Sequence, residues 1–469
     1  MDIVINDLIE SIASQHNAVG VAVSVVDLHD NIYRQYYGTR KLGTILPINE
    51  HTIFATGSIA KTVTALAIMQ MNEEHRIDIN NPIQVYIPEI INSTSTTAIT
   101  PKHFMSHTVG YPQLKATNKH CIARRVAQAY GLEIKEIMNM PEYFLAARED
   151  ITCRVNAALG NPLFEPGSNF TYQNEGYSIL SEVVRCFGGY STYEDYILER
   201  IFSPLSMKRS MYDTNEFRSD DNRVELYDSL DGDVVQIDIN TFYSCPYVGM
   251  GALNSTLYDL EQLGRLFLAH GIDSRGMQVV NRSTIDEMEQ PRVRYFHNTS
   301  YGYGLFVGEI DGTIVCGNNG SGRGISSSIL WSREMGKVVI ALCNTTSVPV
   351  SLITWGVMMH YKGKSPNTHR STYRDIAWDI IDKQDAQGIF SSGDHLPNIE
   401  IVLECSELLL CINGRYRILR PVERDLLIIE GRSTVTEVIV HRDDRGHIWA
   451  ITYNARMAVR LESGIVSER

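Results

Sequence analysis

Residues 58–71 read Ser-Ile-Ala-Lys-Thr-Val-Thr-Ala-Leu-Ala-Ile-Met-Gln-Met, and no charged residue lies between Lys61 and Glu73. This run predicts a mostly buried helix that begins at Ser58. Residues three apart are neighbours on a helix, so the Ser58 hydroxyl and the Lys61 amine share one face. The stretch therefore predicts a nucleophile beside its own base.

A serine hydroxyl is a poor nucleophile, and a lysine accepts its proton only when burial or positive charge keeps the amine partly neutral. The positive end of the helix macrodipole favours negative charge near Ser58. Two other interpretations of the same residues do not involve a catalytic serine. One is an ordinary amphipathic helix with a serine cap, and the other is a phosphate-binding loop over residues 55–62. The loop is disfavoured because Ala55 and Ala60 stand where that motif needs glycine.

A second motif lies in residues 165–174, where a Pro-Gly turn leads into Tyr172-Gln-Asn174 and then into another apolar helix. Read alone, Tyr172 and Asn174 are a turn and a helix cap. Together with Ser58 and Lys61 they resemble the serine β-lactamase and penicillin-binding-protein superfamily, nearest to its class C β-lactamase-like branch of esterases, D-aminopeptidases and acyltransferases. Stretches that look like further landmarks of this branch follow in order at residues 82–88, 99–112, 201–207 and 249–256.

The resemblance implies a role for each matching residue. Ser58 is expected to be the acylated nucleophile, Lys61 its base and Tyr172 a partner in proton transfer. Asn174 is expected to hydrogen-bond Lys61 and the carbonyl side of the substrate. The resemblance also implies an oxyanion hole made by the backbone N–H groups of Ser58 and Ser321, and one such donor is worth about 3 kcal/mol to the transition state.

The third motif departs from the family pattern. Relatives carry Lys-Thr-Gly or His-x-Gly, whereas this chain has Asn318-Asn319-Gly320 followed by Ser321. Asparagine supplies no positive charge and does not titrate, although it donates and accepts hydrogen bonds. We therefore expect Asn318, Gly320 and Ser321 to contribute to substrate binding, and we do not expect β-lactam hydrolysis to be the native activity.

The composition of the chain argues against two classes of binding partner. The net charge of -13, from 42 basic and 55 acidic residues, argues against nucleic acid and anionic membrane surfaces. The first residues lack a basic segment and a sustained apolar run, and no window of about 20 apolar residues occurs, so neither a secretory signal nor a membrane span is predicted. These features favour a cytoplasmic protein. Its oligomeric state stays open.

Cysteine and histidine patterns indicate no metal and no cofactor. Cys316 lies beside the third motif and either faces the pocket or is a small strand residue, the second being favoured. His103 and His107 have the spacing of a helical zinc pair, but Phe104 stands where a metalloprotease needs Glu, and no third ligand is evident. The eight cysteines contain no Cys-x-x-Cys pair and predict reduced, partly buried thiols: Cys121, Cys153, Cys186, Cys245, Cys316, Cys343, Cys405 and Cys411.

Strand patterns occur at both ends of the first 362 residues, with helical patterns between them. A hairpin is predicted over residues 19–26 and 32–37, and later strands over 303–307, 313–316, 326–331 and 337–343. The expected fold is α/β (α+β), with an antiparallel sheet flanked by helices and an all-helical lobe inserted after the nucleophile helix. Thr256 and Asp259 have capping-box spacing and predict a helix through Phe267.

Composition shifts after residue 362. Residues 363–395 are predicted as a linker with a short helix from 373 to 387, and residues 396–469 as a small antiparallel barrel. The barrel prediction rests on strand patterns at 399–405, 408–412, 426–429, 435–441 and 448–453. The resemblance implies a lipocalin-like appendage, which either roofs the cleft or only stabilises or dimerises the protein.

The function expected from these features is a serine hydrolase that forms an acyl-enzyme at Ser58 on an ester, amide or peptide substrate, small-molecule or peptidic. If an alcohol or amine resolves the acyl-enzyme, the protein is an acyltransferase or cyclising thioesterase instead. A non-catalytic binding or scaffold protein is the third alternative, raised by Asn318. The intact Ser58, Lys61 and Tyr172 argue against it.

Overall fold

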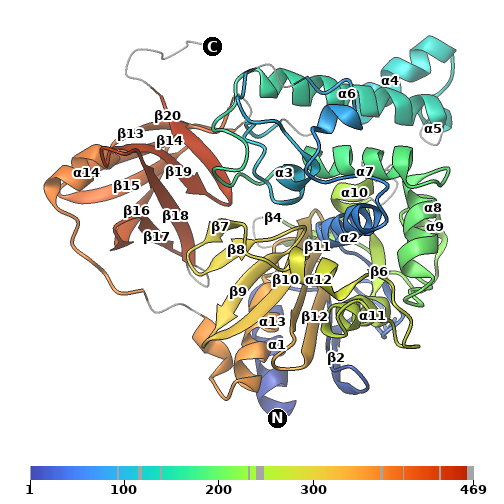
Figure 1. Cartoon of the computed structure of the whole chain (residues 1–469). Coiled ribbons are helices and arrows are strands. Elements are labelled where there is room, and N and C mark those ends of the chain that lie inside the picture. Colours follow the sequence, from blue (N-terminus) through green and yellow to red (C-terminus); the bar gives the residue numbers. More distant parts are fainter. Residues whose placement is uncertain are drawn as a thin grey trace.

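The computed structural model describes residues 2–91, 94–114, 119–137, 140–230, 233–238, 248–369, 373–393, 396–431 and 435–461. Cys245, one of the predicted free thiols, lies outside these residues. An eight-stranded sheet and a closed barrel organise the chain, and Figure 1 shows the barrel in orange to red beside the central sheet.

The central sheet joins strands from both ends of the first 362 residues. It is antiparallel, with the order β2-β1-β12-β11-β10-β9-β8-β7. The predicted hairpin is confirmed, because Val23 in β1 pairs with Gln35 in β2 and with Ala341 in β12. The strands are β1 (Gly20–Val26), β2 (Asn31–Gly38), β7 (Val293–Phe296), β8 (Thr299–Tyr301), β9 (Phe306–Ile310), β10 (Thr313–Gly322), β11 (Ile325–Ser332) and β12 (Lys337–Cys343).

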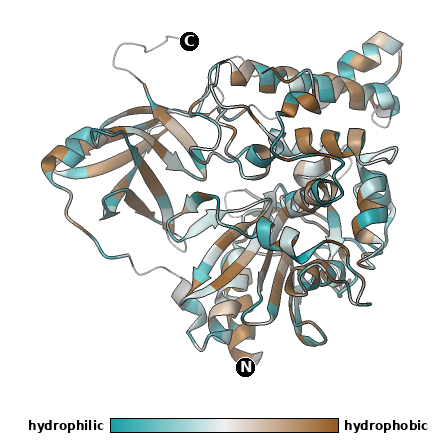
Figure 2. Cartoon of the chain, in the orientation of Figure 1, coloured by the Kyte–Doolittle hydropathy of each residue, from teal (hydrophilic) through white to brown (hydrophobic). Residues whose placement is uncertain are grey.

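Helices cover both faces of this sheet, as the alternation within β1 requires. Val21, Val23 and Val25 pack with α1 (Asp2–Gln15) and α13 (Val350–Tyr361) on one face. Ala22 and Val26 face the opposite core, which contains α2 (Ile59–Glu73) and α11 (Leu257–Leu268). Figure 2 shows the apolar residues concentrated along the sheet strands and the helices that pack on them.

The predicted helical lobe follows α2. In α6 the buried side chains recur every four residues, from Tyr143 through Ala147 and Ile151 to Val155, which gives one apolar face. None of the helices in the described ranges is long and apolar enough to cross a membrane. The lobe contains α4 (Lys119–Tyr130), α5 (Ile134–Ile137), α6 (Pro141–Leu159), α7 (Glu175–Phe187), α8 (Tyr193–Ile197) and a π-helical turn (Leu198–Phe202).

Shorter elements connect the sheet, the lobe and the barrel. Two small two-stranded sheets pair β3 (Ile53–Ala55) with β6 (Asn254–Thr256) and β4 (Tyr227–Leu230) with β5 (Asp233–Gln236). The 3₁₀ turns are Ile83–Val85 and Pro366–His369, and the short helices are α3 (Pro101–Met105), α9 (Thr214–Ser219), α10 (Val248–Gly251), α12 (Arg282–Met288) and α14 (Ile380–Ala386).

The C-terminal strands close into an antiparallel barrel in sequence order, which confirms the predicted small β-barrel. β16 was not predicted because its Arg-Tyr-Arg segment is exposed and breaks the apolar alternation. β13 is a strand of the barrel but lies inside the predicted linker 363–395. The division into 1–362, 363–395 and 396–469 stays a prediction. The strands are β13 (Gly388–Ser391), β14 (Ile399–Glu404), β15 (Glu407–Ile412), β16 (Arg415–Glu423), β17 (Leu426–Glu430), β18 (Val435–Arg442), β19 (Ile448–Tyr453) and β20 (Arg456–Arg460).

Two local predictions need correction. The predicted capping box is only half formed: Thr256 Oγ1 accepts from the Asp259 N–H at 3.1 Å, but the Asp259 carboxylate accepts from the Arg209 N–H at 2.8 Å instead. The strand predicted to end at Cys316 continues to Gly322 because its polar residues pair with β11, for example Asn318 with Ile329. Glycines and asparagines conceal such a strand from pattern-based prediction.

Candidate active site

Ser58 caps α2 and follows Gly57, whose φ is +54°. Strand β3 leads into this turn, and the Thr56 N–H donates to Leu253 O at 3.0 Å. Ser58 is half-buried, whereas Lys61, one turn further along the same face, is fully buried. The sequence therefore places the hydroxyl at the surface of the site and the amine beneath it.

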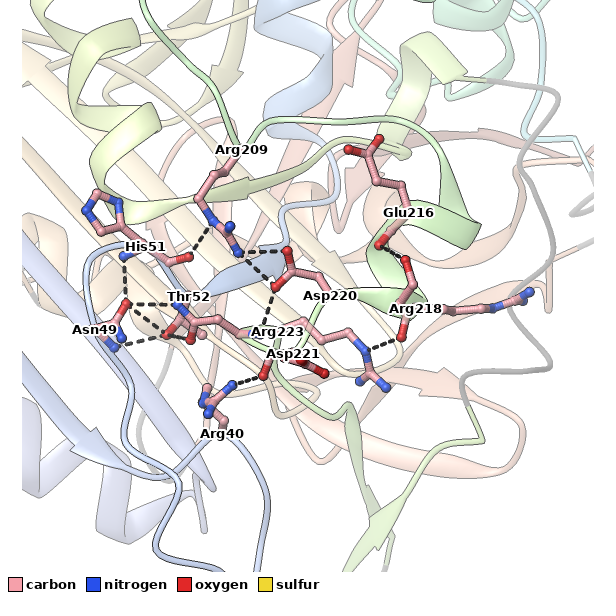
Figure 3. Close-up of polar contacts among 12 residues, drawn as sticks. Arg40, Asn49, His51, Thr52, Arg209, Glu216, Arg218, Asp220, Asp221 and Arg223 are labelled. Atoms are coloured by element: carbon pink, nitrogen blue, oxygen red, sulfur yellow. Dashed lines mark hydrogen bonds and ion pairs between the residues drawn. The ribbon is translucent and has the colours of Figure 1, made fainter.

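A polar network fixes the segment that leads to Ser58 (Figure 3). The Arg209 Nε donates to His51 O at 3.0 Å, and Arg209 Nη2 contacts both carboxylate oxygens of Asp220, at 2.8 and 2.9 Å. The Thr52 hydroxyl donates to Asn222 Oδ1 at 2.9 Å. These contacts hold the residues that lead directly into β3.

The structure brings four predicted residues together. Ser58 Oγ lies 2.7 Å from the Tyr172 hydroxyl and accepts from Lys61 Nζ at 3.0 Å. Lys61 Nζ also donates to Asn174 Oδ1 at 2.9 Å and to Met250 O at 2.5 Å. Three oxygen atoms therefore surround the Lys61 amine and fix its position beneath Ser58. Sequence reasoning missed the role of Met250, because a backbone carbonyl has no residue signature.

Tyr172 is positioned by aromatic packing and by a hydrogen bond to the barrel. Its ring centroid lies 4.4 Å from that of His107, and its N–H donates to Ala455 O at 2.9 Å. Burial, with Lys61 and Arg456 nearby, holds the pKa of His107 well below its ordinary value, and His107 Nδ1 accepts from the Gln173 N–H at 3.2 Å. His107 is therefore a neutral packing partner of Tyr172.

The other histidine of the suspected zinc pair is also engaged inside the protein. His103 Nδ1 accepts from the Thr100 N–H at 3.2 Å, and burial lowers the His103 pKa to about 4. Among the described residues, no group of three or more His, Cys, Asp or Glu is placed to hold a metal ion. Cys316 is buried in the core beside α2, and that burial raises its pKa to about 12.

Strand β10 runs directly past Ser58. A Cβ built on Gly320 would lie 2.0 Å from Thr56 O and 3.0 Å from Ser58 N, so only glycine fits. Ser321 N lies 3.1 Å from the position of a Cβ built on Gly57. No backbone acceptor for the Ser58 N–H occurs within the part of the chain that the structure describes. The two predicted oxyanion donors therefore lie on adjoining segments.

Asn318 lies under Ser58 and is not turned toward open space. The residue is 5% exposed, and Nδ2 donates to Ser58 O at 3.2 Å, Thr62 Oγ1 at 3.1 Å and Gly304 O at 2.9 Å. Its Oδ1 accepts from the Asn319 N–H at 2.9 Å. The Asn318 amide group already connects β10 to the first turn of α2. A contact with the substrate, as predicted, would have to compete with these hydrogen bonds.

A cation from the barrel lies beside the site. The Arg456 guanidinium carbon is 5.7 Å from the Tyr172 ring centroid, and Arg456 Nε donates to Gln113 Oε1 at 2.7 Å. Sequence reasoning missed this residue because nothing in the β19–β20 segment indicates which surface its turn contacts.

This fold and this constellation define a class of proteins with an active-site serine at a helix start, a lysine one turn on and a tyrosine from the helical lobe. The chain belongs to the beta-lactamase family, because the family model described as Beta-lactamase matches residues 5–354. The match runs from α1 into α13 and so contains the whole central sheet.

Individual relatives are distant. The chain is 22% identical over 355 residues to penicillin-binding protein 4 of Amycolatopsis lactamdurans, covering 74% of this chain and 85% of that protein. It is 27% identical over 164 residues to the D-aminopeptidase of Brucella anthropi, but this covers only 34% of the chain and 29% of the relative. The octameric penicillin-binding protein homologue from Pyrococcus abyssi has the same fold, with a TM-score of 0.67, 22% identity and coverage of 98% and 100%.

Proposed function

We propose that the protein is a serine hydrolase that forms an acyl-enzyme at Ser58 on an ester, amide or peptide substrate. One observation carries the proposal: Ser58 Oγ lies within hydrogen-bond distance of both Tyr172, at 2.7 Å, and Lys61 Nζ, at 3.0 Å. A nucleophile and its base in contact are the signature of covalent catalysis. Family membership supports the same conclusion.

Acylation starts when Ser58 Oγ attacks the substrate carbonyl carbon while its proton passes to Tyr172 or Lys61. The tetrahedral oxyanion receives hydrogen bonds from the Ser58 and Ser321 N–H groups. The intermediate collapses as the C–N or C–O bond breaks, and the leaving group takes up the proton. Water then attacks the ester carbonyl and loses a proton to the same base, which releases the acid and restores Ser58.

The names of relatives favour amide and peptide substrates. One relative is named a penicillin-binding protein and another a D-aminopeptidase. We therefore infer that acyl compounds with an amino-acid-like leaving group are the first substrates to test. The Pyrococcus homologue is octameric, which raises the question of whether this chain also self-associates. Light scattering measures this in parallel with the substrate assays.

The test is intact-mass analysis after exposure to a fluorophosphonate or an activated ester. Wild type is expected to gain one adduct per chain, and Ser58→Ala none. Ser168→Ala is the matched control, because Ser168 is exposed in the turn before Tyr172 and should leave labelling intact. An adduct that persists in Ser58→Ala overturns the proposal that Ser58 is the nucleophile. The absence of any adduct on wild type also overturns it and favours a non-catalytic binding protein.

Acyl transfer to an amine or alcohol is the second candidate, because Arg456 and the barrel hairpin adjoin Tyr172, the residue that would accept the proton of an incoming nucleophile. Product analysis separates the two functions. Hydrolysis gives the free acid whether or not an amino acid is added, whereas transfer gives an amide or ester whose share rises with the concentration of the added acceptor.

A further inference from the structure

The third motif leaves the site without its usual second cation, since Asn318 is neutral and bonded inside the protein. Arg323, which follows β10, does not replace it. Arg323 Nε forms an ion pair with Asp228 Oδ2 at 3.0 Å, and the Arg323 side chain is 67% exposed. Its charge is therefore matched by a carboxylate and faces solvent.

The turn between β19 and β20 fixes a different arginine next to the reacting groups. Asn454 and Ala455 form this turn with φ values of 48° and 62°. Ala455 O accepts from the Tyr172 N–H at 2.9 Å, and the Met457 N–H donates to Thr171 Oγ1 at 3.2 Å. These two bonds lie on either side of Arg456 in the chain, so the hairpin holds Arg456 against the Tyr172 segment.

The Arg456 guanidinium has a spare donor, and it forms no ion pair with the residues that the structure describes. Nε donates to Gln113 Oε1 and Nη1 to Asn454 O at 3.5 Å, whereas Nη2 donates to no acceptor within the described ranges. Burial raises the pKa of Glu175, and the charge of Arg456 opposes this shift after several larger effects, but no described carboxylate forms an ion pair with Arg456. Arg456 is half-buried. Its positive charge contributes to lowering the pKa of His107, after the larger effects of burial and Lys61. An ion pair with an anionic group of the substrate would therefore stabilise the complex, because the cation is partly desolvated and has no ion-pair partner of its own.

The position of Arg456 indicates which part of the substrate meets it. Arg456 lies across the ring of Tyr172, and Tyr172 is the residue whose hydroxyl lies 2.7 Å from Ser58 Oγ and so can pass the proton to the leaving group. A group bound by Arg456 is therefore on the leaving-group side of the scissile bond. The planar fork of a guanidinium matches a carboxylate with two parallel hydrogen bonds.

We propose that Arg456 of the barrel binds a carboxylate on the leaving group of the substrate, and so replaces the missing third-motif cation. This inference rests on the proposed acyl-enzyme at Ser58 and makes it more specific. The preferred substrate is an acyl compound whose leaving group is an amino acid or a similar carboxylate-bearing nucleophile. The barrel then supplies a specificity-determining residue to the active site.

The test uses two thioester probes that differ in one group: a phenylacetyl thioester of thioglycolate and the same thioester of thioglycolamide, with thiol release followed by a colorimetric thiol reagent. Wild type is expected to prefer the carboxylate probe by ten- to hundredfold in kcat/KM, as one bidentate charge-assisted pair allows. Arg456→Gln should bring the ratio of the two kcat/KM values close to one, and Arg456→Lys should retain part of it.

Arg323→Gln is the matched control, because it removes the same charge from an arginine already paired with Asp228. It should keep the wild-type ratio. Equal turnover of both probes by wild type, or an unchanged ratio in a folded Arg456→Gln, overturns the role of Arg456 while the acyl-enzyme stands. If neither probe releases thiol and Ser58 carries no adduct, both proposals are overturned.

Discussion

At the scale of single residues, the Ser58 oxygen is held between a phenol and an amine. Lys61 is buried and uses three acceptors, so its position is fixed from three sides. Tyr172 depends on His107 and Ala455 for its position. Each contact removes freedom that the catalytic groups would otherwise lose during the reaction.

Tyr172→Phe removes the phenolic oxygen but retains the ring that packs on His107 at 4.4 Å. We expect kcat/KM for an activated ester to fall by about 10² to 10⁴, the usual value of a positioned proton carrier. The midpoint of thermal unfolding should change little because packing is kept. Ester turnover and a thermal melt check both statements, and unimpaired turnover would remove Tyr172 from the mechanism.

Gly320→Ala places a methyl group 2.0 Å from Thr56 O and 2.4 Å from Ser327 Oγ. Backbone must move, so β10 retreats from Ser58, at a stability cost of about 1 to 3 kcal/mol. Displacing one oxyanion donor lowers kcat by about 10² to 10³. Gly322→Ala is the control, since its nearest neighbour is Ile325 Cδ1 at 3.3 Å. Equal effects of the two variants in urea unfolding and turnover assays would contradict this geometry.

The residues visible in the sequence were those whose chemistry is local. Ser58 and Lys61 share one helical turn, and Tyr172 precedes Asn174 at the start of α7, so residue type and spacing suffice. Met250 contacts Lys61 through its backbone carbonyl, and Arg456 is brought to Tyr172 by a hairpin of the barrel. Neither depends on a short motif, so neither was predicted. Asn318 departs from the family motif in the sequence, but its inward hydrogen bonds depend on the packing of β10 against α2, which residue type does not show.

At the scale of elements, the start of α3 depends on a neutral histidine. His103 Nδ1 accepts from the Thr100 N–H, which a protonated imidazole cannot do. Burial lowers the His103 pKa from 6.5 to about 4. Between these two pH values the unfolded chain binds a proton that the folded chain does not, so stability falls as pH falls.

We therefore expect the free energy of unfolding to decrease between pH 6.5 and pH 4, with His103 contributing up to about 3 kcal/mol of the loss. His441, whose pKa burial also lowers to about 4, acts in the same direction. His103→Asn should make the decrease shallower without abolishing it. Urea unfolding at pH 7.5, 5.5 and 4.5 measures the slope. A variant with the wild-type slope would show that His103 is not responsible.

At the scale of the whole molecule, the barrel and the catalytic sheet meet at the active site. Phe164, from the segment before Tyr172, packs against Ala450 and Met457 of the barrel. The His297 N–H, in the turn between β7 and β8, donates to Glu437 Oε2 of β18 at 2.8 Å. The barrel is thus bonded to both sides of the catalytic unit, and its β19–β20 turn supplies Ala455 and Arg456.

Phe164→Ala should lower the free energy of unfolding by about 3 kcal/mol and also reduce kcat/KM, because the cavity loosens the hairpin that positions Tyr172. Leu419→Ala is the control: Leu419 is buried in β16, which is farthest from β20 in the strand order of the closed barrel. It should cost similar stability with little loss of activity at low temperature. Parallel activity losses in both variants would mean that stability alone governs turnover.

The proposed chemistry requires that Ser58 becomes covalently acylated. The most direct measurement is a rapid-mixing experiment with a p-nitrophenyl ester, quenched in acid during turnover and followed by peptide mass spectrometry of the full chain. We predict a burst of about one nitrophenolate per chain, with the acyl mass on the peptide containing Ser58 and neither signal in Ser58→Ala. An acyl group on another residue, or a burst that survives in Ser58→Ala, would contradict the account.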